Sequence, residues 1–166
     1  MGGLFGNGKD SVYLTPIIIL AQADFLEDIY NAGGGNYFDV VSIHPYDSAK
    51  WTDSTATLEA AIEATKGIMN TYGDSTKELW LTELGPYYFP PSPVAFISQT
   101  GYTESQEASW VNLIYTNLKS KCDKLFFYEL RDYPGSGTLY NPNWEGLMYF
   151  DYRTKEAYGA YKSLVK

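Results

Sequence analysis

A carboxylate at the end of an apolar run is the residue of this sequence with the clearest capacity for chemistry. The segment Lys77–Pro86 (KELWLTELGP) opens with charge, continues with bulky apolar residues and places Glu83 just before a Gly-Pro pair. Such a run between turn formers predicts a short buried strand, in which Glu83 shares a face with Leu79 and Leu81. Desolvating a carboxylate costs several kcal/mol unless partners are supplied. Glu83 is therefore a candidate reactive group, and the alternative is an ordinary acid at a strand end.

Two more strand-like segments end in polar residues. Residues 37–44 (YFDVVSIH) are rich in β-forming residues and lead into His44-Pro45-Tyr46, and residues 124–130 (KLFFYEL) end near Glu129. The carboxyl ends of parallel strands form the face at which α/β barrels carry their chemistry. The three strand ends are thus predicted to lie at one edge of a sheet.

Amphipathic helices are predicted between these strands. Apolar residues recur at helical spacing, glycines follow two of the helices, and Thr103 with Gln106 forms a capping box at the start of a third. Alternating helices and strands predict parallel strands joined by right-handed crossovers. The predicted helices cover residues 21–32, 57–72, 103–119 and 155–164.

The composition excludes several classes of protein. The chain has 166 residues and a net charge of −8, which argues against binding to nucleic acid or to an anionic membrane surface. Cys122 is the only cysteine, so no internal disulfide can form, and a single histidine excludes a His-rich metal site. No run approaches the ~20 apolar residues of a membrane helix. No cofactor is expected.

Three segments together resemble part of a known enzyme clan. They are residues 38–46 (FDVVSIHPY), residues 79–85 (LWLTELG), and Gly146-Leu147 followed by Asp151 and residues 155–158 (KEAY). In this order and spacing they resemble the C-terminal half of a retaining glycoside hydrolase of the large (β/α)8-barrel clan, closest to its cellulase, β-xylosidase and glucanase-like members. The resemblance covers nearly the whole chain.

The resemblance implies roles for residues at the strand ends. Glu83 matches the catalytic nucleophile at the end of strand seven, and His44 and Tyr46 match the His-x-Tyr motif that lines the sugar site. We expect the Tyr46 hydroxyl to donate a hydrogen bond of about 2.5–3.0 Å to the Glu83 carboxylate. The alternative for Tyr46 is packing beneath the loop that carries Trp51.

Aromatic residues are further candidates for the sugar site. The last strand of the clan commonly supplies a tryptophan platform, where this chain has Phe127 and Tyr128. Tyr87 and Trp144 belong to loops after the strand ends and could stack on sugar rings, although each could equally pack within its loop. These four residues are predicted to bind substrate.

The chain also departs from the clan pattern. The general acid/base of the clan is a glutamate after an asparagine, and no Asn-Glu pair occurs in these 166 residues. Glu129 and Asp132 are possible substitutes, although solvated or Arg131-paired acids are the simpler interpretation. Glu156 also replaces the proline that usually follows the lysine of the tail motif.

The predicted fold class is α/β: a single domain over residues 1–166 that forms a partial, half (β/α)8 barrel with parallel strands six to eight and flanking helices. A whole barrel takes about 250 residues. Three explanations stay open: a fragment of a longer enzyme, a half-barrel completed by a partner, and a stand-alone descendant with covered edges. Exposed strand edges favour pairing with another chain, which makes a homo-oligomer or a complementary half-barrel chain the expected protein partner.

Two functional hypotheses follow from the resemblance. One is a glycoside hydrolase-like protein that acts on β-linked glycans or glycosides by a retaining mechanism, with Glu83 as nucleophile once the missing half is supplied. The other is a non-catalytic carbohydrate-binding or structural half-barrel. The resemblance alone suggests an extracellular location.

Overall fold

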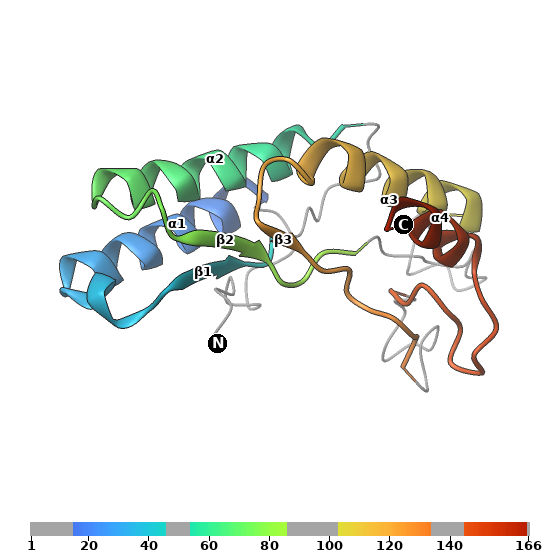
Figure 1. Cartoon of the computed structure of the whole chain (residues 1–166). Helices are drawn as coiled ribbons and strands as arrows, with labels where there is room; N and C mark the ends of the chain where they lie inside the picture. Colours follow the sequence, from blue (N-terminus) through green and yellow to red (C-terminus); the bar gives the residue numbers. More distant parts are fainter. Residues whose placement is uncertain (1–14, 46–53, 86–102, 134–144, 166) are drawn as a thin grey trace, which may run out of the picture. The chain divides into compact units, whose positions relative to one another are not determined.

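The computed structural model describes residues 15–45, 54–85, 103–133 and 145–165. Its elements follow the alternation expected from the sequence (Figure 1). They are α1 (Thr15–Asn31), the 3₁₀ helix η1 (Gly34–Tyr37), β1 (Val40–Ile43), α2 (Ala56–Thr71), β2 (Glu78–Leu81), α3 (Glu104–Leu118), β3 (Lys124–Leu125) and α4 (Glu156–Leu164). No helix within these described ranges is both long and apolar enough to cross a membrane.

The three strands form one parallel sheet in the order β1-β2-β3. The register pairs Val41 with Leu79 and Ile43 with Leu81, so apolar side chains of the two strands lie opposite each other. Those four side chains are almost fully buried. The mixed α/β class with parallel strands is therefore as predicted.

The strands are shorter than the sequence pattern suggested. Residues 34–37 form η1, and β1 begins only at Val40. The predicted strand over residues 124–130 pairs with β2 only at Lys124 and Leu125. The Phe126 N–H still donates to the Leu81 carbonyl of β2. Farther on, the backbone pairs with a later segment, because the Glu129 N–H donates to the Glu145 carbonyl and the Leu147 N–H donates to that of Glu129.

The helices agree more closely with the predicted ranges. Thr103 and Gln106 form the expected capping box, in which each side chain accepts a hydrogen bond from the backbone N–H of the other, at 3.2 and 2.9 Å. Gly33 adopts a left-handed conformation, with φ 78°, just after α1. α1 begins earlier than predicted, at Thr15, because the apolar run of residues 16–20 belongs to the helix.

The chain divides into two compact units. The first comprises Met1–Leu84 with Asn117–Phe126 and holds the sheet, α1 and α2; the second comprises Gly85–Thr116 with Phe127–Lys166. In the first unit α1 and α2 lie side by side on the same side of the sheet (Figure 1). The core of this unit is formed by apolar residues of the sheet and the helices, chiefly Leu26, Val41, Ile43, Leu58, Ile62, Met69, Leu79 and Leu81.

The second unit has its own apolar cluster. Val111 of α3, Leu147 and Ala157 of α4 are buried together, and Phe127 and Tyr161 pack against them. Gly85, also in this unit, approaches the Tyr128 carbonyl so closely that a Cβ would lie 1.9 Å from its oxygen. A larger residue at position 85 would displace the backbone.

Candidate active site

The carboxyl ends of β1 and β2 bring His44 and Glu83 together. Strand pairing ends at Ile43 and Leu81, and the Thr82 N–H still donates to the Ile43 carbonyl at 3.2 Å. His44 and Thr82 therefore follow directly in register, and Glu83 is the next residue. The pairing of two parallel strands thus determines which side chains meet at this edge.

His44 lies between Thr82 and Glu83. Its Nε2 atom is 2.9 Å from Thr82 Oγ1, which is a hydrogen-bond distance. Its Nδ1 atom is 3.6 Å from Glu83 Oε2, close enough for a strong electrostatic interaction but longer than a hydrogen bond. The His44 side chain is 8% exposed and that of Glu83 is 26% exposed, so the carboxylate keeps access to a ligand.

Burial determines the protonation state of the imidazole. Desolvation lowers the pKa of His44 below its usual 6.5, and the negative charge of Glu83 acts in the opposite direction. The net direction is downward. His44 is therefore neutral at neutral pH, and one of its two nitrogens carries a proton.

The other predicted site residues lie elsewhere. Tyr46, Tyr87 and Trp144 lie outside the described residues, so the expected Tyr46–Glu83 hydrogen bond stays a prediction. Phe127 belongs to the second unit, where its ring meets that of Tyr161 edge to face with centroids 5.2 Å apart. Tyr128, in the same unit, is exposed. Their roles in substrate binding also stay predictions.

The sequence pattern did not predict the contact between Thr82 and His44. Strict strand alternation puts Thr82 and Glu83 on opposite faces, yet one imidazole contacts both. The reason is that β2 ends at Leu81, so the two residues lie beyond the regular pleat. Only the strand register, which a local pattern does not reveal, identifies Thr82 as the neighbour of His44.

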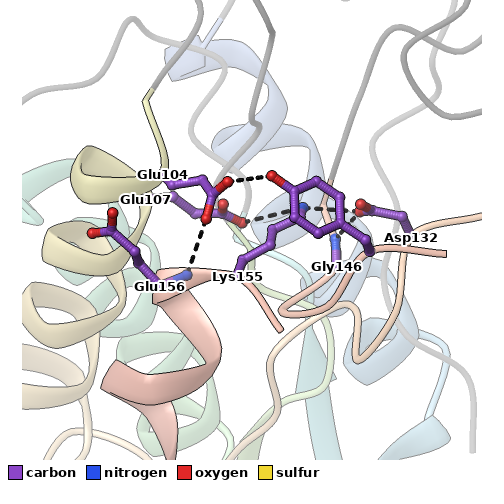
Figure 2. A network of polar contacts seen from close by, with 7 residues as sticks. Glu104, Glu107, Asp132, Gly146, Lys155 and Glu156 are labelled. Atoms are coloured by element: carbon purple, nitrogen blue, oxygen red, sulfur yellow. Dashed lines mark hydrogen bonds and ion pairs between the residues drawn. The ribbon is translucent and has the colours of Figure 1, made fainter. Parts of the chain in front are cut away.

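A buried ionic cluster occupies the second unit (Figure 2). Lys155, just before α4, places its ammonium 3.0 Å from Asp132 Oδ1 and 3.8 Å from Glu107 Oε1. All three side chains are at most 1% exposed. The Gly146 N–H also donates to Asp132 Oδ1, at 2.8 Å. Asp132, interpreted from the sequence as a solvated or Arg131-paired acid, is instead paired with Lys155 in this cluster.

The cluster holds two acids against one lysine. Burial raises the pKa of Glu107 to about 8, an effect that the Lys155 ammonium only partly offsets. Asp132 is closer to the ammonium and accepts the Gly146 N–H, so it is the better site for the negative charge. A protonated Glu107 beside a Lys155–Asp132 pair leaves the buried cluster neutral.

A neighbouring acid connects α3 to the start of α4. Glu104 Oε2 accepts the Glu156 N–H at 3.2 Å, in the first turn of α4, and its other oxygen accepts the Tyr149 hydroxyl proton (Figure 2). A carboxylate at a helix N-terminus satisfies a free N–H and interacts favourably with the helix dipole. The lysine of the tail motif and this cap together position α4.

The described residues contain no group of three or more His, Cys, Asp or Glu side chains that could hold a metal ion. His44 and Glu83 form the candidate site on their own chemistry, which is that of a carboxylate beside a neutral imidazole.

Solved structures with a similar fold include glycoside hydrolases. A thermostable mutant of a xylanase from Cellvibrio japonicus matches 90% of this chain and 46% of its own, with 16% identity and a TM-score of 0.62. A family 39 glycoside hydrolase from Bacteroides cellulosilyticus WH2 matches 84% and 29%, with 21% identity and a TM-score of 0.64. A GH2 beta-galacturonidase from Eisenbergiella tayi matches 75% and 23%, with 16% identity and a TM-score of 0.55.

These similarities concern the fold. No protein-family model and no curated protein matches the chain. The chain spans less than half the length of these solved structures. At the level of the fold, the resemblance to barrel-type glycoside hydrolases expected from the sequence is confirmed.

Proposed function

We propose that this chain supplies the nucleophile-bearing half of a retaining glycoside hydrolase barrel, with Glu83 as the nucleophile. The observation that carries the proposal is the Glu83 carboxylate, partly exposed beside a buried neutral His44 at the carboxyl ends of two paired strands. The fold around these strands is similar to that of glycoside hydrolases. An acid at this edge of a parallel sheet is where such folds carry out their chemistry.

The proposed reaction has two steps. A Glu83 oxygen attacks the anomeric carbon and forms a covalent glycosyl-enzyme, while the bond from that carbon to the leaving oxygen breaks and its electron pair departs with the leaving group. A second carboxylic acid protonates the leaving oxygen, and its carboxylate then takes a proton from the water that hydrolyses the intermediate.

The second carboxyl group has to come from outside this chain's matched motifs, because the sequence has no Asn-Glu pair. The rest of the barrel, in the same polypeptide or in a complementary chain, would supply it. The substrate class would be β-linked glycans or glycosides, bound by His44 and by the aromatic residues predicted to line the site: Tyr46, Tyr87, Phe127, Tyr128 and Trp144.

The missing acid/base residue favours one other candidate function. A chain that keeps the sugar site but lacks a proton donor would bind carbohydrate without hydrolysing it, or would serve as a structural or assembly half-barrel. The two candidates differ in one property, which is whether Glu83 forms a covalent bond to a sugar.

An activated substrate tests this property without the missing acid. A 2,4-dinitrophenolate leaves without protonation, so 2,4-dinitrophenyl 2-deoxy-2-fluoro glycosides require only the nucleophile. We would incubate the chain with the β-xyloside, β-cellobioside and β-galacturonide and measure its intact mass and peptide map. The proposal predicts a sugar adduct on Glu83 that is absent in Glu83→Gln and kept in Glu63→Gln, a matched control at an exposed position of α2. Sugar binding without an adduct would support the non-catalytic candidate.

A further inference from the structure

The pairing of β1 with β2 places a hydroxyl group against the imidazole of His44. The backbone N–H of Thr82 donates a hydrogen bond to the carbonyl of Ile43 in β1. Ile43 directly precedes His44. The Oγ1 atom of Thr82 lies 2.9 Å from His44 Nε2. The hydroxyl and the ring are therefore held together both by the sheet and by a direct hydrogen bond.

The contacts of the ring with Glu83 and Thr82 differ in chemistry. A carboxylate accepts hydrogen bonds and cannot donate, whereas a hydroxyl can do either. The Nδ1 atom faces the Glu83 carboxylate at 3.6 Å, so a proton on Nδ1 is attracted to that charge and a lone pair there is repelled. The neutral ring then has its lone pair on Nε2, and the Thr82 hydroxyl is free to turn its proton toward that lone pair.

We propose that Thr82 is a positioning residue, whose hydroxyl donates to His44 Nε2 and so holds the neutral ring with its Nδ1–H directed at the Glu83 carboxylate. The hydrogen bond made by one ring nitrogen sets the state of the other. Because the ring is buried, no solvent competes strongly for either position.

This arrangement suits the task proposed for Glu83. A neutral N–H orients the carboxylate without adding the full positive charge of an imidazolium, which would oppose the loss of negative charge during attack. The inference deepens the proposed function, on which its catalytic meaning rests. Its test concerns only the protonation of the His44 ring. The ring can prove to be protonated on Nε2 while Glu83 is a nucleophile, and it can be protonated on Nδ1 while Glu83 is not.

The single histidine makes the test direct. In ¹⁵N-labelled chain purified without a histidine tag, a long-range ¹H–¹⁵N correlation spectrum at about pH 8 contains one imidazole, that of His44. The proposal predicts a protonated Nδ1 and an unprotonated, hydrogen-bonded Nε2 in the wild type. Protonation on Nε2 would overturn the proposal, because the ring would then be the donor to Thr82.

Variants of Thr82 provide the second readout. Thr82→Ser keeps the hydroxyl and is expected to keep the wild-type ring signals. Thr82→Val keeps the shape without the hydroxyl, and the Nε2 resonance is expected to move to the position of a nitrogen without a donor. Thr71→Val is the matched control, because the Thr71 hydroxyl bonds to the Gly67 carbonyl on an exposed part of α2. Unchanged Nε2 signals in Thr82→Val would overturn the proposal, and the wild-type spectrum decides the outcome if that variant does not fold.

Discussion

The Nδ1 atom of His44 lies 3.6 Å from Oε2 of Glu83, although one residue follows β1 and the other follows β2. The register that pairs Ile43 with Leu81 produces this proximity. His44 is buried and Glu83 is partly exposed, so the pair combines a fixed imidazole with a carboxylate that a ligand can reach.

This pair predicts the titration of His44. Burial lowers the pKa of His44 below 6.5 and Glu83 opposes that effect, so Glu83→Gln is expected to lower the pKa further. NMR titration of the single imidazole measures both values. The unfolded chain binds a proton between the lowered pKa and about 6.5, whereas the folded chain does not, so stability falls with decreasing pH across that window. A pKa that rises in Glu83→Gln would contradict the account.

The buried acid Glu107 is expected to make the stability of the fold decrease as the pH rises, which is opposite to the effect of His44. The folded pKa of Glu107, about 8, lies above the usual 4.5, so the unfolded chain loses this proton first as the pH rises. The contribution of Glu107 to stability is full below about pH 4.5 and is lost by about pH 8. The unfolding free energy lost across this pH window amounts to a few kcal/mol. Glu107→Gln is expected to abolish this loss. Urea unfolding of both proteins from pH 5 to 8 measures it, and parallel pH curves would contradict the prediction.

Lys155 is expected to be the most sensitive residue of the cluster. Lys155→Met leaves Asp132 and Glu107 buried without their cation, and removal of one partner of a buried ion pair costs about 3–5 kcal/mol. The loss should be smaller at acidic pH, because burial raises the pKa of Asp132 and its protonation removes the uncompensated charge. Lys162→Met, at an exposed position of α4, is the matched control and should have little effect. Equal effects of the two variants would contradict a specific role of Lys155.

The edges of the sheet predict association. β1 and β3 are the outer strands of the sheet in the part of the chain that the structure describes, and parallel edges tend to pair with another chain. Sedimentation velocity at micromolar concentration is expected to show a dimer or larger species. A compact monomer alone would mean that the edges are covered within the chain.

Local patterns in the sequence predicted the helices well. The capping box at Thr103 and Gln106 and the glycine after α1 act within a few residues, so their effect can be deduced from the sequence. The burial of Leu79 and Leu81 followed from alternation for the same reason.

Features that depend on long-range pairing could not be predicted. The segment after Phe126 has β-forming residues, but its backbone pairs with the segment near Glu145 rather than with β2. Glu107 lies at helical spacing from the buried Trp110, Val111 and Ile114, so its place on the inner face of α3 follows from the sequence pattern. Its partners Lys155 and Asp132 are distant in sequence, and no local pattern identifies them. The contact of Thr82 with His44 depends on the register in the same way.

The most direct measurement of the central claim, that Glu83 is a nucleophile, is the stereochemistry of an azide reaction. Azide needs no general base, so it can replace water at a glycosyl-enzyme that lacks the acid/base residue. With a 2,4-dinitrophenyl β-glycoside, the account predicts slow release of dinitrophenolate without azide and faster release with it. The product should be the β-glycosyl azide, formed by two inversions at the anomeric carbon, and Glu83→Gln should abolish it. An α-glycosyl azide from the wild type, or a β-glycosyl azide that Glu83→Gln still forms, would contradict the claim.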